Sequence, residues 1–224
     1  MSFDNVNYQK ILNFIKNSSK FYQNANIPSI IAVTKTQPVG VILEAIRAGI
    51  SMFGENRVQE AIIKYKNIKT VHKQVRLHMI GPLQTNKARK ALEIFDFIHS
   101  LDRENLAKEF VKNANFPFLS NKFFFVQINT GKEKQKMGIN VDEADEFIKY
   151  CLHDLKLNVI GLMCIPPHND NPAPHFIMLK KLASQNHLQH LSMGMSSDYE
   201  IALKKGATFI RIGSQLFGDR QLIK

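Results

Sequence analysis

Short apolar segments rich in Ile, Val and Phe alternate with longer amphipathic segments along most of the sequence. This alternation is typical of repeated β-α units, and it predicts a parallel sheet covered by helices. The sequence predicts eight strands, at 29–35, 51–55, 76–81, 96–101, 122–129, 158–165, 188–193 and 207–212. An open doubly wound sheet would need fewer strands, so we expect a closed (β/α)8 TIM barrel.

The amphipathic segments between these strands predict the helices. They cover 38–49, 57–68, 85–95, 103–114, 142–155, 174–185 and 197–205. A further helix is expected near residues 5–24, before the first strand. Because almost nothing remains for a second domain, we expect residues 1–224 to form a single domain, with an N-terminal helix in residues 1–26 and the barrel in residues 27–220.

The composition predicts a protein of the cytoplasm. The chain has 224 residues, 44% of them hydrophobic, which is enough for a sizeable core. No run approaches the ~20 apolar residues of a membrane span, and the N-terminus lacks the apolar core of a signal peptide. Cys151 and Cys164 are the only cysteines. They are too few for a disulfide framework and are not spaced as metal ligands, so we expect free thiols and no metal site.

The chain is strongly basic. Lys and Arg outnumber Asp and Glu by 30 to 19, which gives a net charge of +11. Such a charge suits an anionic ligand or a nucleic acid. The basic residues are scattered through helical segments without a nucleic-acid-binding signature, so we expect no nucleic-acid partner. The alternative is an RNA-binding protein without a cofactor, whose affinity for RNA would depend strongly on salt.

Polar residues follow several of the predicted strands. Lys35 ends the first strand segment, and Asn56 follows the second. In a barrel these positions share the rim at the C-terminal ends of the strands, where active sites lie. Each residue taken alone is also an ordinary turn former. Their clustering at one rim is what indicates a site.

The last two β-α units predict an anion site. The segment LSMGMSSDYEIAL leads from a strand into Ser196 and then a helix, and TFIRIGSQLFG ends a strand with Gly213 and Ser214. Turns of this kind present backbone N–H groups, and barrels frequently bind phosphate in the loops after strands seven and eight. An ordinary helix cap and a tight turn would explain either segment alone. Their joint position favours phosphate.

Arg211 lies within the last strand, on the same face as Phe209 and Gly213. The guanidinium would then point into either the barrel or the helix layer. In either place, when buried, it needs a carboxylate, a phosphate or an aromatic nitrogen as its partner. Lys35 could supply a nucleophilic amine, because desolvation favours the neutral form of an amine. An amine for a Schiff base, a phosphate site and a partner for a ring nitrogen are together what pyridoxal 5′-phosphate needs.

Eight segments then occur in one order: AVTKTQP, FGENRVQEA, HMIGPLQTNKARKAL, HSLDRENLA, KMGI, GLMCIP, LSMGMSSDYEIAL and RIGSQLFGDR. With these motifs the chain resembles the YggS/PROSC family of pyridoxal phosphate homeostasis proteins over roughly residues 29–220. The resemblance implies a barrel like the cofactor domain of alanine racemase, with pyridoxal 5′-phosphate held as a Schiff base on Lys35. The other residues that it implies for cofactor binding are Asn56 near the ring, Arg211 facing the ring nitrogen, and Ser196, Gly213 and Ser214 at the phosphate.

The same resemblance implies a carrier rather than an enzyme. An arginine does not readily protonate a pyridine, and an unprotonated ring is a weaker electron sink. Racemases of this type also take a second acid/base from another domain across a dimer, whereas Tyr65, Tyr150 and Tyr199 fall in helical patterns here. We therefore expect a monomeric, non-catalytic protein of pyridoxal phosphate homeostasis that contacts apo-enzymes transiently. The alternative is a low-activity amino-acid racemase.

Glu133 and Lys136 lie in TGKEKQKMG, which matches a family stretch near the cofactor entrance. If these residues are functional, Lys136 would be a second amine able to take the aldehyde or attract the phosphate, which would suit transfer to apo-enzymes. A solvated charged loop would explain both residues equally well. The segment HNDNPAP, residues 168–174, departs from the longer acidic loop that is usual in the family.

Overall fold

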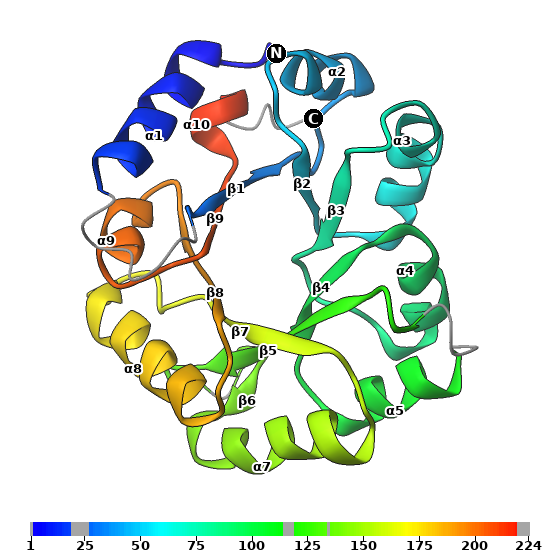
Figure 1. Ribbon diagram of the computed structural model, residues 1–224, viewed down its shortest axis with the longest axis vertical. Coiled ribbons are helices and arrows are strands. Elements are labelled where there is room, and N and C mark those ends of the chain that lie inside the picture. The colour runs from blue at the N-terminus through cyan, green and yellow to red at the C-terminus, as the bar shows by residue number, and fades with distance from the viewer. Residues whose placement is uncertain (1, 19–26, 114–118, 134, 219–224) are drawn as a thin grey trace.

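The computed structural model describes residues 2–18, 27–113, 119–133 and 135–218. Within them, eight parallel strands close into a barrel, and the helices surround it (Figure 1). The closing contacts are the pairing of β4 with β5 and of β1 with β9. The strands are β1 Ser29–Val33, β2 Met52–Glu55, β3 Arg76–Met79, β4 Phe97–Leu101, β5 Phe123–Asn129, β7 Val159–Cys164, β8 His190–Met195 and β9 Phe209–Ile212. The predicted barrel is confirmed.

The helices follow the strands in the expected alternation. They are α1 Asn5–Asn17, α2 Val39–Arg47, α3 Val58–Val71, α4 Ala88–Ile94, α5 Glu104–Lys112, α7 Ala144–Lys149, α8 Pro172–Gln185, α9 Tyr199–Lys204 and α10 Ser214–Phe217. Short 3-10 turns, η2 Thr85–Lys87 and η3 Val141–Glu143, precede α4 and α7. In the described part of the chain, no helix is long and apolar enough to cross a membrane.

Several boundaries differ from the predictions. The first strand ends at Val33, so Lys35 lies in the turn after β1 rather than on the strand. The short strand β6, Ile139–Asn140, pairs beside β5 and was not predicted, because two residues carry no periodicity. The helix expected over residues 142–155 changes to a π-helix, η4, at Tyr150–Asp154. Of the helix expected near residues 5–24, the stretch Asn5–Asn17 is helical, and residues 19–26 lie outside the described residues.

The N-terminal helix covers the barrel next to its last strand. The helix α10 is only four residues long, so it shields little of the barrel by itself. The backbone N–H of Asp4 donates to the carbonyl of Leu216 at 2.8 Å, and the rings of Phe3 and Phe217 lie 6.0 Å apart. The Asp4 carboxylate also accepts from the backbone N–H of Asn7, which caps α1. The segment outside the repeat thus completes the helix layer.

Side chains fill the interior of the barrel. Ile31, Phe125, Met163 and Phe209 form an apolar cluster there, and each is at most 6% exposed. Two histidines share this interior and stack on phenylalanine rings. Since the strand interior is packed, a ligand site must lie at an end of the barrel.

Candidate functional site

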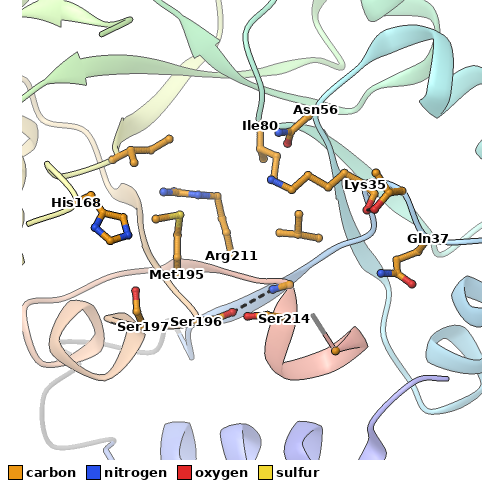
Figure 2. Close-up of a pocket in the computed structure, with 15 residues that line it drawn as sticks. Lys35, Gln37, Asn56, Ile80, His168, Met195, Ser196, Ser197, Arg211 and Ser214 are labelled. Atoms are coloured by element: carbon orange, nitrogen blue, oxygen red, sulfur yellow. Dashed lines mark hydrogen bonds between the residues drawn. The ribbon is translucent and has the colours of Figure 1, made fainter. Parts of the chain in front are cut away.

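A cavity of about 540 Å³ opens at the C-terminal ends of the strands (Figure 2). Lys35 follows β1, Asn56 follows β2, Ile80 follows β3, and Arg211 extends from β9. In Figure 2 the Lys35 side chain reaches from the right toward the middle of the view, where the Arg211 side chain lies. Parallel strands bring their C-terminal ends to one rim, which is why residues so far apart in sequence meet here.

All the residues predicted to bind the cofactor line this one cavity. They are Lys35, Asn56, Ser196, Arg211, Gly213 and Ser214. The two residues predicted for the entrance are not part of its lining. Glu133 and Lys136 lie in the turn between β5 and β6, where their side chains form an ion pair at 2.5 Å. Their role at the entrance stays a prediction.

The helix α3 holds the backbone on both sides of Lys35. The Lys64 amine donates to the carbonyl of Thr34 at 2.7 Å, and the Glu60 carboxylate accepts from the backbone N–H of Thr36 at 2.5 Å. Lys64 and Glu60 also pair with each other at 2.5 Å. Thr36 adopts a φ of 66°, a left-handed conformation that a residue with a side chain rarely takes. The turn that carries Lys35 is therefore held in an uncommon shape by a neighbouring helix.

A buried polar cluster lies beneath this turn. Glu55 is completely buried and accepts hydrogen bonds from Thr34 Oγ1 at 2.8 Å and from Lys64 at 3.1 Å. The Tyr65 hydroxyl lies 2.6 Å from Thr34 Oγ1 and can donate to it, because the threonine hydrogen is already used for Glu55. Burial raises the pKa of Glu55, and Lys64 and Thr34 offset part of that rise. The cluster stiffens the base from which Lys35 projects.

Arg211 is 4% exposed and has no carboxylate partner among the described residues. Its Nη1 donates to Ser192 Oγ at 2.8 Å, and its Nη2 donates to the carbonyl of Cys164 at 2.9 Å. Burial lowers the pKa of Arg211 from its ordinary value. Both partners are neutral oxygens, so neither balances the charge of the guanidinium. The cation is available to a ligand in the cavity.

Hydrogen bonds join the two segments predicted to hold a phosphate. The backbone N–H of Gly213 donates to Ser196 Oγ at 3.3 Å, drawn as the dashed line in Figure 2, and Gln215 Nε2 donates to the Ser196 carbonyl at 2.7 Å. A Cβ on Gly213 would meet Val33 at an ordinary 3.5 Å, so packing does not demand glycine there. Asp198 occupies the N-cap position of α9, but its carboxylate accepts from the backbone N–H of Met195 at 2.6 Å rather than from the N–H groups of the helix.

Four polar residues of the cavity lining were not predicted as site residues, namely Thr36, Gln37, His168 and Ser197. Gln37 is 5% exposed, and its Oε1 has no hydrogen-bond partner in the described structure. His168 is exposed, and its Nδ1 lies 3.0 Å from Asn169 Oδ1. Gln37 lies two residues after Lys35, which could have suggested a shared direction. The segment of His168 has no periodicity, so only the closed barrel reveals its position.

The polar lining of the cavity consists of basic and neutral side chains. The described residues that line it include one lysine and one arginine, together with serine, threonine, asparagine, glutamine and histidine side chains, but neither Asp nor Glu. Two basic side chains on a lining that includes no acidic residue among the described residues favour a positive potential in a partly enclosed space. This electrostatic pattern selects an anionic ligand.

Known proteins share this architecture. The model of the alanine racemase N-terminal domain family matches residues 10–221. A pyridoxal phosphate homeostasis protein of Aquifex aeolicus is 40% identical over 207 residues, which are 88% of this chain and 89% of that protein. The structure of PipY from Synechococcus elongatus with PLP bound is 33% identical, with a TM-score of 0.75 over 91% of this chain and 98% of that one. An alanine racemase from Corynebacterium glutamicum has a TM-score of 0.68 over 98% of this chain and 63% of that one, at 15% identity, and is alike in fold alone.

Fold and family model together define a barrel of the alanine racemase N-terminal type. The relatives narrow this class further, because they match the chain over nearly its whole length. The chain belongs to the family of pyridoxal phosphate homeostasis proteins, the YggS/PROSC family that its motifs indicated.

Proposed function

We propose that this protein binds pyridoxal 5′-phosphate as a Schiff base on Lys35 and serves in intracellular pyridoxal phosphate homeostasis as a carrier. The observation that carries the proposal is that Lys35 and Arg211 line one cavity whose described lining residues include neither Asp nor Glu. The bound cofactor would supply an electrophilic aldehyde, a phosphate dianion and a ring nitrogen with a lone pair. The residues of the cavity fit each of these groups.

The fit can be argued group by group. Lys35 supplies the amine, on a turn held from both sides by α3. Arg211 donates hydrogen bonds but has no acceptor, so it suits an unprotonated ring nitrogen. Ser196, Gly213 and Ser214 present hydroxyl and backbone donors at one end of the cavity, which suits a phosphate. Asn56 lies beside Ile80 on the wall near Lys35 in Figure 2, which suits contact with the ring.

The charge of Arg211 supports a role as a carrier. Arg211 keeps its proton, so a ring nitrogen that faces it stays unprotonated and is a poor electron sink for a carbanion. In addition, none of the described tyrosines lines the cavity, and Tyr65 is fully buried against Thr34. We propose that the protein acts as a monomer in the cytoplasm and contacts apo-enzymes transiently.

The decisive test is an absorption spectrum of the purified protein, followed by borohydride reduction and peptide mapping. We expect a visible absorption band and a reduced pyridoxyl group on Lys35. The variant Lys35→Arg should lose both, whereas Lys90→Arg, which changes an exposed lysine of α4, should retain both. A wild-type protein that stays colourless after addition of pyridoxal 5′-phosphate would refute the proposal.

Delivery of the cofactor can be tested separately. If Lys136 acts at the entrance, Lys136→Ala should slow reactivation of a pyridoxal-phosphate-dependent apo-enzyme without changing the amount of cofactor bound. The matched control is Lys149→Ala, because Lys149 forms a similar ion pair, with Asp145 at 2.6 Å, on α7. Transfer at the wild-type rate by Lys136→Ala would remove Lys136 from the proposal.

One observation favours a second candidate, a low-activity amino-acid racemase. His168 places an imidazole on the lining of the cavity, and in Figure 2 it lies on the opposite side from Lys35. A racemase needs acid/base groups on both faces of its substrate. Exchange of the α-proton of alanine in deuterated buffer, lost in His168→Asn, would support the racemase, and the absence of exchange in the wild type would support the carrier.

A further inference from the structure

A chain of buried hydrogen bonds leads from the cavity into the core of the barrel, through side chains of four strands. Arg211 Nη1 on β9 donates to Ser192 Oγ on β8 at 2.8 Å, and Ser192 Oγ lies 2.9 Å from Nδ1 of His99 on β4. His99 Nε2 lies in turn 2.9 Å from Nδ1 of His78 on β3. Ser192, His99 and His78 are completely buried. Only Arg211 reaches the cavity.

Both imidazoles of this hydrogen-bond chain, those of His78 and His99, are neutral. Burial, with a contribution from Lys69, lowers the pKa of His78 to about 3, and burial also lowers the pKa of His99 well below its ordinary value. His78 stacks on Phe97 with ring centroids 4.3 Å apart, and His99 stacks on Phe125 at 4.2 Å. A neutral imidazole has one N–H donor and one nitrogen acceptor. Each histidine therefore donates at one ring nitrogen and accepts at the other, and the hydrogen bonds can run in either of two directions.

The Arg211 guanidinium, at one end of the hydrogen-bond chain, determines the direction of these hydrogen bonds. A guanidinium can only donate, so Ser192 accepts from Arg211. The hydroxyl hydrogen of Ser192 then has one acceptor among its described partners, Nδ1 of His99. This places the proton of His99 on Nε2, from which it is donated to Nδ1 of His78. The proton of His78 consequently lies on its own Nε2.

The reverse order would satisfy fewer groups. If His99 donated from Nδ1 to Ser192, the serine hydroxyl hydrogen would have no acceptor, although the group is fully buried. An unpartnered buried donor is costly, so the first order is favoured. The Nε2 atom of His78 has no hydrogen-bond partner in the described structure. In a series of donors that starts at Arg211, the last donor has no acceptor within the series, and His78 Nε2 is that last donor.

We propose that Ser192, His99 and His78 are positioning residues, which fix the Arg211 guanidinium for the ring nitrogen of the cofactor. This inference rests on the proposed function. His99 binds the hydroxyl hydrogen of Ser192 and so keeps a serine lone pair directed at Nη1. The carbonyl of Cys164 holds Nη2, and two anchored nitrogens prevent rotation of the planar group. The other guanidinium N–H groups stay available to the cavity.

The order of the chain can be tested without any cofactor. Long-range ¹H–¹⁵N NMR of the purified, histidine-labelled protein reports which ring nitrogen carries the proton, and His78→Gln assigns the pair. We expect His99 and His78 both to be protonated on Nε2, with His99 losing this preference in Ser192→Ala. A wild-type His99 protonated on Nδ1 would overturn the proposed order, and this measurement needs no variant that might fail to fold.

The positioning role can be tested by the spectrum and the affinity of the cofactor complex. We expect Ser192→Ala to bind pyridoxal 5′-phosphate roughly tenfold more weakly, the scale of one hydrogen bond to a charged group, and to shift the absorption band. Ser192→Thr retains the hydroxyl and should restore the wild-type band. The matched control is Ser100→Ala, because Ser100 is equally buried on β4 but its Oγ has no partner in the described structure. A Ser192→Ala variant with wild-type band and affinity would overturn the role.

The two possible failures are distinguishable. If the wild-type protein binds no pyridoxal 5′-phosphate, the proposed function is wrong and the positioning role falls with it, while the NMR result still decides the order of the chain. If Lys35 is labelled but Ser192→Ala behaves like Ser100→Ala, only the positioning role is wrong.

Discussion

Acidification from pH 7 to pH 5 should destabilise the fold through the buried His78. Its pKa is lowered by burial to about 3 in the folded protein, against an ordinary value of 6.5 in an unfolded chain. Between these two values the unfolded chain binds more protons than the folded one, so stability falls as the pH falls. The stability is fully present above pH 6.5 and is lost progressively toward pH 3. For these two pKa values, linkage gives a loss of roughly 2 kcal/mol between pH 7 and pH 5.

Other buried groups add to this slope or oppose it. Burial also lowers the pKa of His99, which acts in the same direction. The pKa of Glu55 is raised by burial, so the folded state binds the extra proton above the ordinary value of 4.5, and this group opposes the histidines. A comparison of variants is therefore needed to isolate the share of His78.

Urea unfolding of the cofactor-free protein at pH 5, 6 and 7 measures that share. The loss of stability on acidification should be smaller in His78→Gln than in the wild type, by on the order of 2 kcal/mol. The control Phe97→Leu removes the ring stacked on His78 but no titratable group. Its free energy of unfolding should be lower at every pH and should depend on pH as in the wild type. An unchanged slope in His78→Gln would refute the neutral, buried state argued for this side chain.

Three further results are expected. Gly81→Ala should weaken binding of pyridoxal 5′-phosphate roughly tenfold, measured by spectral titration, because its Cβ would lie 2.6 Å from the backbone of Asn56 and displace that residue. Gly161→Ala should lower the free energy of unfolding in urea by about 1–3 kcal/mol or more, because its Cβ would overlap the backbone of β8. Cys151 and Cys164 should resist a thiol reagent at pH 8 until urea unfolds the protein, because burial raises the pKa of both thiols to about 12. Rapid labelling of the native protein would contradict this.

Much of the site was predictable because its residues belong to local patterns. Lys35 and Asn56 end apolar segments, and Gly213 and Ser214 follow one, so the alternation of strands and helices places them at the same rim. The strand period placed Arg211 on one face with Phe209 and Gly213, but it left open whether that face points into the barrel or toward the helices. The structure shows that Arg211 is buried and reaches the cavity. The partners of Arg211 within the protein, two neutral oxygens, were not predicted. The aromatic nitrogen expected as its ligand partner stays a prediction.

The sequence by itself determined the repeat, since hydrophobic period and turn residues act over a few neighbours in the chain. It thereby determined the number of barrel strands and the rim that carries the site. Only the tertiary structure decided which inward side chains meet, because contacts across a closed barrel depend on strand register and tilt. The order Arg211, Ser192, His99 and His78 joins the last strands to the third and fourth, and no local pattern relates them. The same closure brings His168 and Gln37 to the wall of one cavity.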